Sequence, residues 1–144
     1  MPGAEAHLTL LLTRRVTFAA AHVLRRPDWD EERNRAVFGP CASDHGHNYV
    51  LEVGVTGEPD PETGMVVNLR DLDSVVREAV VAHVDHRHLN RDVPFLRGMV
   101  PTAEYLALAF WDRLEDCLRE RAPAARLQRL RLVESENNAV EVCR

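Results

Sequence analysis

The sequence predicts an α+β protein in which helices pack on one face of an antiparallel sheet. Two observations support this prediction. Apolar and other residues alternate, as in strands with one buried face, over residues 8–22, 45–57 and 127–134. Apolar residues also recur at helical spacing in two stretches, which begin after Asn68 and after Thr102. The predicted order along the chain is therefore strand, hairpin, helix, helix, hairpin.

The first part of the chain is predicted to form one long strand followed by a loop. Along 8–22, the residues Val16, Phe18 and Ala20 lie two apart and define the buried face of the strand. The next segment, 23–44, contains prolines, a glycine and many charged residues. We therefore expect it to be a loop or to hold only short structure.

Two hairpins are expected. In the first, the strand 45–57 is followed by the sequence EPDPETG at 58–64, which is typical of a turn, and 65–67 returns as a short strand. In the second, the strands 127–134 and 139–143 are separated by the turn sequence Glu-Asn-Asn.

Two helices are expected between the hairpins. Asn68 can cap the first helix, which ends before the polar stretch at 85–90. Thr102 can cap the second helix, and Pro123 terminates it. The apolar stripes that define their buried faces are Leu72, Val75, Val76, Ala79 and Val80 in the first and Leu106, Phe110, Leu114 and Leu118 in the second.

Composition limits the class of protein. With 144 residues and 45% apolar content, the chain suits a single domain over 1–144 with a substantial core. Its net charge is −5, so nucleic acid is not an expected partner. All 18 basic residues are arginine, which excludes catalysis by lysine. Three widely spaced cysteines do not make a disulfide framework.

No targeting or membrane segment is expected. The apolar runs are too short to span a bilayer. A short apolar stretch near the N-terminus precedes Arg14 and Arg15, whereas a secretory signal carries its basic residues first. We therefore expect a cytoplasmic protein that does not interact with a membrane.

Three histidines form the first candidate site. His45 and His47 lie two residues apart at the start of a predicted strand, so both side chains point to the same face. His22 lies at the end of the apolar face of the strand 8–22. Three neutral imidazoles with one open position are the ligand set of a catalytic zinc site. The alternative is that these are surface or hydrogen-bonded core histidines that bind no metal.

Cys41 lies four residues before His45, in the loop that leads into the histidine strand. Beside a zinc ion and cationic groups its thiolate would be favoured, and it could then act as a base or nucleophile. The competing interpretation makes Cys41 a fourth ligand that closes the site and makes it structural. We favour the open site because functional groups lie elsewhere in the chain and the adjoining loop contains Gly39 and Pro40.

Asp85 and His86 are adjacent and directly follow the first predicted helix. A carboxylate beside an imidazole raises its basicity and orients it, which suits proton transfer. Alternatively, a histidine at this position can satisfy carbonyl groups at the helix end. His83 and His88 lack a comparable neighbour, and we expect them to be solvated.

Glu134 is the carboxylate that most strongly indicates ligand binding. By alternation it follows Leu130 and Leu132 onto the buried face of its strand, where an ionised glutamate needs a partner. That partner is either a ligand with two N–H donors or an arginine from elsewhere in the fold. Glu104, in the first turn of the second helix, can be an ordinary helix-terminal charge.

Seven segments together resemble the 6-pyruvoyl-tetrahydropterin synthase family, which includes the bacterial 6-carboxytetrahydropterin synthases. In chain order they are FAAAH (18–22), FGPC (38–41), HGHNY (45–49), DPETGMVVNLRDL (60–72), VDHRHLN (84–90), PTAEY (101–105) and VESENN (133–138). Their order and spacing are more specific than any one segment, and they extend over nearly the whole chain.

The resemblance implies a zinc enzyme. It implies zinc held by His22, His45 and His47, with Cys41 as the base that removes a proton from the substrate side chain.

The resemblance also implies roles for residues away from the metal. Asp85 and His86 look like the pair that relays or supplies protons. Glu134 resembles the family's pterin anchor, whose carboxylate pairs with the 2-amino and ring N–H groups. Thr102 and Glu104 match the stretch that helps hold the pterin across a subunit boundary.

The reaction that the resemblance implies starts from 7,8-dihydroneopterin triphosphate, with zinc as a Lewis acid on the side-chain oxygens. The pyruvoyl enzymes release triphosphate and form 6-pyruvoyl-tetrahydropterin by internal redox tautomerisation. The carboxy enzymes of the queuosine pathway release acetaldehyde as well as triphosphate. A non-catalytic, zinc-stabilised pterin-binding module and another chemistry on a related pterin are the remaining alternatives.

The two branches of the family match different details of this chain. The FGPC, ETGMV and ESENN sequences are similar to the pyruvoyl enzymes, which we therefore place first. The three residues between Cys41 and His45 are fewer than in animal pyruvoyl enzymes and resemble the carboxy branch, to which the apparently bacterial composition also points.

The family further implies the tunnelling fold, or T-fold. Each subunit contributes a four-stranded antiparallel sheet with two helices on one face, three subunits close a barrel, and two trimers stack as a homohexamer. A triphosphate requires local positive charge. In an acidic protein, arginines gathered at a subunit interface would supply it.

Overall fold

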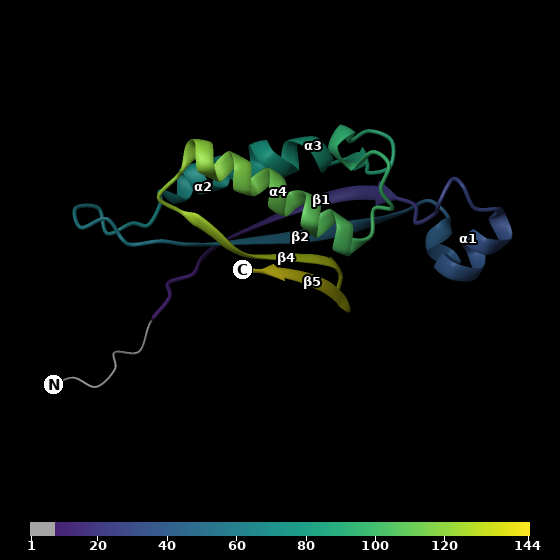
Figure 1. Cartoon of the computed structure of the whole chain (residues 1–144), viewed down its shortest axis with the longest axis horizontal. Coiled ribbons are helices and arrows are strands. Elements are labelled where there is room, and N and C mark those ends of the chain that lie inside the picture. Colours follow the sequence, from purple (N-terminus) through teal and green to yellow (C-terminus); the bar gives the residue numbers. More distant parts are fainter. Residues whose placement is uncertain (1–7) are drawn as a thin grey trace.

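The computed structural model describes residues 8–144 and arranges them in two layers, a sheet and a group of helices that covers one of its faces (Figure 1). The predicted α+β class is confirmed. Residues 1–7, part of the N-terminal segment in which the sequence indicates no secretory signal, lie outside the described residues. Within 8–144, no helix is both long enough and apolar enough to cross a bilayer.

Within the described part of the chain, five strands form the sheet. They are β1 (Leu12–His22), β2 (His45–Thr56), β3 (Arg87–His88), β4 (Arg126–Ser135) and β5 (Asn138–Cys143). Their order across the sheet is β3-β1-β2-β4-β5. Every neighbouring pair is antiparallel except β1 and β3, which are parallel. The four long strands are those that the sequence predicts.

Three details of the strand prediction are wrong. Residues 65–67 form no strand, because the backbone N–H of Asp60 bonds the carbonyl of Met65 at 2.9 Å and the segment folds back on its own turn. The strand β3 lies in the polar stretch that the sequence predicts as loop, and its two residues are too few to show alternation. The first strand also begins at Leu12 rather than at residue 8.

The segment 23–44 contains more helix than the sequence indicates. Helix α1 (Glu31–Phe38) is followed by a 3₁₀ turn (Gly39–Ala42). The buried residue of α1 is the polar Asn34, so the helix has no apolar stripe. The Asn34 side chain accepts a hydrogen bond from the Arg26 N–H and donates to three backbone carbonyls of the same segment. Polar bonds rather than apolar packing therefore organise this segment.

The helical layer consists of one composite helix and one long regular helix. Their parts are α2 (Leu69–Val76), a π-helical stretch (Arg77–Val81), α3 (Ala82–Val84) and α4 (Ala103–Arg121). Both predicted caps are confirmed, since Asn68 accepts from the Arg70 N–H at 2.9 Å and Thr102 from the Tyr105 N–H at 3.2 Å. The π-helical stretch has no counterpart in the prediction, because its side chains keep an apolar pattern close to that of an α-helix.

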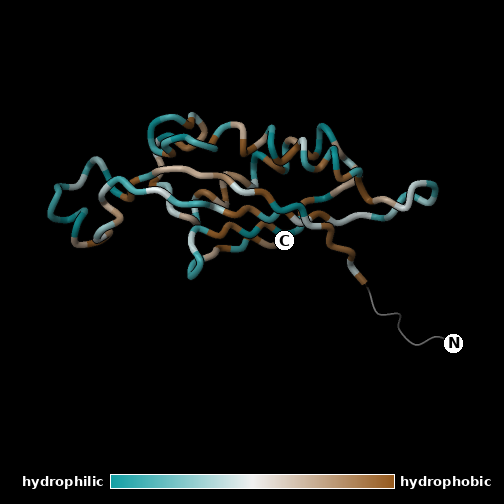
Figure 2. The backbone as a smooth tube through the Cα atoms, turned by 180° about the vertical axis from the view of Figure 1, so that it is seen from behind, coloured by the Kyte–Doolittle hydropathy of each residue, from teal (hydrophilic) through white to brown (hydrophobic). Residues whose placement is uncertain are grey.

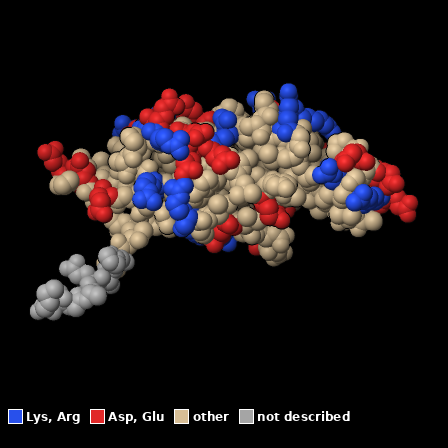
Figure 3. All heavy atoms as spheres, viewed as in Figure 1, with Lys and Arg blue, Asp and Glu red and all other residues tan. Residues whose placement is uncertain are grey.

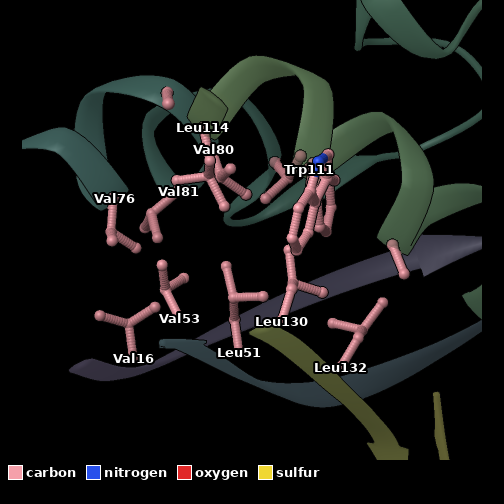
Figure 4. Packing of buried hydrophobic residues seen from close by; sticks show 14 of the residues in the cluster. Val16, Leu51, Val53, Val76, Val80, Val81, Trp111, Leu114, Leu130 and Leu132 are labelled. Atoms are coloured by element: carbon pink, nitrogen blue, oxygen red, sulfur yellow. The ribbon is translucent and has the colours of Figure 1, made fainter. Parts of the chain in front are cut away.

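Apolar side chains fill the space between the two layers. Figure 4 shows side chains from the helices pointing toward side chains of the sheet, namely Val76, Val80, Val81, Trp111 and Leu114 above and Val16, Leu51, Val53, Leu130 and Leu132 below. Full burial of one such side chain stabilises the fold by roughly 1.5–3 kcal/mol. In Figure 2 the loops at the two ends of the molecule are mainly teal, whereas brown segments concentrate in the elements between them.

Candidate metal centre and active site

Three imidazoles converge at one end of the sheet face that carries the core. In the β1–β2 register, His22 lies opposite His45, and His47 lies opposite the small residue Ala20. The ring centroids are 4.5 Å apart for His22 and His45, 5.1 Å for His22 and His47, and 5.0 Å for the third pair. One possible ligand nitrogen from each ring lies within 4.8 Å of the other two. The three histidines are therefore positioned to bind one metal ion.

Hydrogen bonds fix the orientation of two of these rings. The His22 Nδ1–H donates to the Pro101 carbonyl at 2.9 Å, and the His45 Nδ1–H donates to the Ser43 carbonyl at 2.8 Å. Each ring then presents its Nε2 lone pair for coordination. The Nε2 atoms of His22 and His47 are buried and have no hydrogen-bond partner in the described structure. A metal ion would satisfy these otherwise costly buried acceptors.

Burial keeps the imidazoles of His22 and His47 in the neutral form that binds metal. Burial is the main reason that the pKa of His22 falls from 6.5 to about 4; the bond to Pro101 opposes this shift, and the neighbouring histidines add to it. Burial likewise lowers the pKa of His47, and the Glu134 carboxylate partly offsets that effect. A set of three imidazoles fits zinc, which prefers nitrogen and sulfur ligands.

An aromatic pair supports the histidines from the core side. The rings of Phe18 and Tyr49 stack with centroids 4.8 Å apart and an interplanar angle of 12°. The Tyr49 ring lies 5.5 Å from the His47 ring and 6.2 Å from the His22 ring. Burial raises the pKa of the Tyr49 phenol far above its ordinary value, so the phenol stays neutral. The pair therefore positions the imidazoles by packing rather than by charge.

Glu134 approaches the histidines from β4. The β4–β5 ladder is irregular between Val133 and Ser135, so Glu134 lies at a bulge. Its Oε1 atom is 3.8 Å from His47 Nε2, and each side chain is 20% exposed. The sequence predicts either a ligand or an arginine as the partner of Glu134. In the structure its neighbour is His47 instead. Because His47 is neutral, the carboxylate keeps its capacity to accept hydrogen bonds from a ligand.

Cys41 is half-buried in the 3₁₀ turn that precedes β2. Its carbonyl accepts from the Leu24 N–H at 2.8 Å, which fixes the turn against the chain that follows His22. Among residues 8–144, the group positioned to hold a metal consists of the three histidines and does not include Cys41. This geometry favours the open site over the alternative in which Cys41 is a fourth ligand.

Asp85 and His86 lie at the edge of the sheet, between α3 and β3. Asp85 Oδ1 accepts from the Ala19 N–H at 3.0 Å and lies 3.0 Å from His86 Nδ1. The His86 imidazole is 83% exposed, and its backbone has a φ of 60°, which is uncommon for a residue with a side chain. His86 and His47 both line a shallow groove of about 500 Å³. No hydrogen bond within 8–144 connects this pair to Cys41.

The start of α4 forms a wall of the histidine cluster. The Pro101 carbonyl holds the His22 ring, and Thr102 follows directly as the helix cap. Glu104 lies in the first turn with its side chain exposed to solvent. Thr102 is therefore one residue away from the carbonyl that contacts His22. The Glu104 side chain, in contrast, is exposed to solvent.

Sequence reasoning missed several polar residues that support the cluster. His88, which the sequence predicts to be solvated, is only 14% exposed, and its Nε2 lies 2.8 Å from Asp44 Oδ1. Asp44 directly precedes His45, so this contact connects β3 to the histidine strand. Asn90 accepts from the Val23 N–H at 2.9 Å and donates to the Val23 carbonyl at 3.0 Å. For Asp44, its position directly before the candidate ligand His45 was the signal that could have found it.

Comparison with known proteins yields relatives over nearly the whole chain. A family model described as 6-pyruvoyl tetrahydropterin synthase matches residues 11–144. A Homo sapiens protein named 6-pyruvoyl tetrahydrobiopterin synthase is 40% identical over 131 residues, which cover 90% of this chain and 88% of the relative. An Archaeoglobus fulgidus protein provisionally named 6-carboxy-5,6,7,8-tetrahydropterin synthase is 33% identical over 104 residues, which cover 72% of this chain and 79% of the relative.

A solved structure gives the same result for the fold. The 6-pyruvoyl tetrahydropterin synthase of Caenorhabditis elegans matches with a TM-score of 0.85 and 30% identity, covering 95% of this chain and 96% of that chain. The T-fold that the resemblance implies for the subunit is therefore confirmed.

Proposed function

The chain belongs to the 6-pyruvoyl tetrahydropterin synthase family, and on that premise we propose that it is a zinc-dependent lyase. Its substrate is 7,8-dihydroneopterin triphosphate, and its products are 6-pyruvoyl-tetrahydropterin and triphosphate. One observation carries the metal dependence: two of three converging imidazoles have a buried Nε2 atom without a partner in the described structure. We further propose a cytoplasmic homohexamer of two stacked trimers.

The residues that would hold zinc are His22, His45 and His47. When bound, zinc supplies Lewis-acid polarisation of the substrate side-chain oxygens and so makes the adjacent C–H more acidic. Cys41 takes up the proton from that carbon as the general base. Its turn is held by a 2.8 Å backbone bond to Leu24, two residues after His22, and this supports a fixed approach to the reacting carbon.

Asp85 and His86 serve as the proton-transfer pair. The Asp85 carboxylate, 3.0 Å from His86 Nδ1, orients the imidazole. The high exposure of His86 and its lack of a bond to Cys41 within the described chain support a site that is completed only when subunits assemble.

Three further residues recognise the pterin. Glu134 is the anchor that accepts the 2-amino and ring N–H groups, and its position 3.8 Å from His47 supports a ring held beside the metal. Thr102 and Glu104 hold the pterin across a subunit boundary, for which the outward position of Glu104 is suitable.

A second candidate is 6-carboxytetrahydropterin synthase activity on the same substrate, with release of acetaldehyde and triphosphate. The three-residue spacing between Cys41 and His45 favours it, as does the archaeal relative. The pyruvoyl activity stands first because the human relative is more similar and extends over more of the chain.

The proposal is tested by incubating the purified zinc-loaded protein with 7,8-dihydroneopterin triphosphate. Triphosphate release is measured, and the pterin product is identified by mass spectrometry, which separates the two activities. Removal of zinc by a chelator should stop turnover, and added zinc should restore it. Chelator-insensitive turnover would contradict zinc dependence. Binding of substrate without conversion by the assembled protein would identify a non-catalytic pterin-binding module.

Replacement of the base separates chemistry from metal binding. Cys41→Ala should lower turnover by roughly 10²–10⁴-fold, because it removes a general base, while the zinc content stays unchanged. Cys117→Ala is the matched control, because Cys117 is also half-buried but lies on α4. Loss of zinc from the Cys41 variant would instead support its role as a fourth ligand.

A further inference from the structure

A second groove, with a volume of about 370 Å³, lies beside the metal centre. Its walls carry Arg25, Arg26 and Arg91 together with His88 and Asn90, and the described residues that line it include no carboxylate. We propose that this groove binds the triphosphate of the substrate, so that its arginines hold the leaving group next to the metal centre. The identity of the ligand rests on the proposed function, whereas the cationic groove does not.

The groove adjoins His22 on two sides. Val23, which lines the groove, directly follows His22, the last residue of β1. Val100, which also lines it, directly precedes Pro101, whose carbonyl holds the His22 ring at 2.9 Å. A phosphate chain in the groove would therefore lie one residue away from a metal ligand. This proximity suits a substrate whose reacting carbons are only a few bonds from its phosphates.

A third connection runs through Asp44, which directly precedes His45. Asp44 Oδ1 lies 2.8 Å from His88 Nε2, and its Oδ2 lies 3.5 Å from Arg91 Nη2. Both partners line the groove. One carboxylate therefore contacts two groups of the groove and connects them to the histidine strand.

Carboxylates outside the groove orient the other two arginines. Arg25 Nη2 lies 2.5 Å from Glu31 Oε2, and Arg26 Nε lies 3.0 Å from Asp28 Oδ1. A guanidinium has five N–H donors, so each arginine keeps donors for phosphate oxygens. In Figure 3 the end of the molecule around α1 carries blue and red side chains together, as these pairs require.

Charge explains why a polyphosphate is the ligand that fits. The chain has a net charge of −5, so a polyanion is repelled unless cations are gathered locally. Three guanidiniums line one groove while their carboxylate partners lie outside it, and arginine matches phosphate geometry with paired hydrogen bonds. Each exposed ion pair that they now make is weak, so a ligand with several charges can compete for them.

The proposal is tested by calorimetric titration of the zinc-loaded full-length protein with inorganic triphosphate. Arg25→Ala, Arg26→Ala and Arg91→Ala should each weaken binding about tenfold, and the first two combined about a hundredfold. Arg35→Ala is the matched control, because Arg35 shares Glu31 with Arg25 but does not line the groove. Zinc content is measured after each titration to separate binding from chelation, and circular dichroism confirms that each variant is folded.

Kinetics and a phosphate-free ligand make the assignment specific. In the Arg25 and Arg26 variants KM for 7,8-dihydroneopterin triphosphate should rise about tenfold with kcat nearly unchanged. Affinity for 7,8-dihydroneopterin, which lacks the phosphates, should stay at the wild-type value. Equal triphosphate affinity in the wild type and all arginine variants would overturn the assignment of the groove as the triphosphate site. It would leave the lyase proposal standing. Arginine-dependent triphosphate binding by a protein that converts no substrate would overturn the lyase proposal and leave the groove standing.

Discussion

The face of the sheet formed by β1 and β2 has two ends that follow the same alternation but carry different residues. At one end, Leu51 and Val53 are fully buried beneath the helices and contact apolar neighbours (Figure 4). At the other end, the same face carries His22, His45 and His47, and two of the three leave a buried nitrogen without a partner in the described structure.

This difference separates what the strand period decides from what the residue type decides. The period determines which side chains are buried at both ends. At the apolar end, burial itself is stabilising. At the histidine end, each unsatisfied buried nitrogen costs about 1–3 kcal/mol until a ligand binds it. The histidine end of the sheet is therefore organised for binding at the expense of stability in the metal-free protein.

The largest effect is expected from substitution of a candidate ligand at the histidine end. His45→Ala should lower zinc affinity by more than ~100-fold, since loss of a ligand exceeds the cost of losing a residue that only supports one, and turnover should fall below detection. Zinc is measured by mass spectrometry after dialysis. Asn48→Ala, on the opposite face of β2, should retain zinc. Full zinc content in the His45 variant would show that the cluster is not the ligand set.

A substitution at the apolar end should instead lower stability and leave zinc binding intact. Leu51→Ala should lower the free energy of unfolding by about 2–5 kcal/mol, because it leaves a cavity in the core, while the folded variant keeps its zinc. Urea denaturation and zinc analysis check the two parts. Val50→Ala, on the other, less buried face of the same strand, should cost clearly less. Equal costs for the two variants would contradict the assignment of the buried face.

Acidification of the chelator-treated protein should lower its free energy of unfolding through the histidine end of the sheet. The His22 pKa is about 4 in the folded state and 6.5 when unperturbed, so between these values the unfolded chain binds a proton that the folded chain does not. The contribution of neutral His22 to the free energy of unfolding is therefore complete above pH 6.5, and it is lost as the pH falls through about 4. The unfolding free energy should decline by about 1.4 kcal/mol per pH unit in this window.

This decline is measured by urea denaturation at several pH values. His22→Gln should remove most of it, because the side chain no longer titrates. Asn48→Ala, which removes no titratable group, should leave it unchanged. A wild-type curve that is flat between pH 6.5 and 4 would show that His22 is not held in the neutral form by burial.

The smallest effect is expected where α4 supports the histidine end. Thr102→Ala should cost about 1 kcal/mol of stability, because the Tyr105 N–H loses its capping acceptor. Thr102→Ser keeps the hydroxyl and should restore most of the loss. Thermal denaturation measures both variants. An alanine variant as stable as the wild type would show that the cap contributes nothing to the wall around His22.

Much of the metal site could be predicted from the sequence because it depends on local geometry. The two-residue spacing of His45 and His47 and the alternation that leads to His22 are properties of single strands. The register that places His22 opposite His45 is not local, and no pattern within one strand contains it. The Pro101 carbonyl comes from a segment 79 residues away, so only the folded chain reveals it.

The fold shows the same limit. Helix α4 could be predicted because its apolar stripe and cap are both in the sequence, whereas α1 is held by the polar side chain of Asn34. Alternation placed Glu134 on the buried face but could not show the bulge that carries it beside His47. The partner of His88 also escaped prediction, because Asp44 lies 44 residues earlier in the chain.

The π-helical stretch Arg77–Val81 has a consequence for the sheet edge beyond it. A π turn holds more residues than an α turn, so it changes the angular phase of everything that follows in the helix. Asp85 emerges where its carboxylate meets the Ala19 N–H. A chain one residue shorter in this stretch would wind as an ordinary helix and swing that carboxylate off the edge of β1. Helical winding thus contributes to the direction in which Asp85 leaves the helix, together with the extended backbone of Asp85 itself.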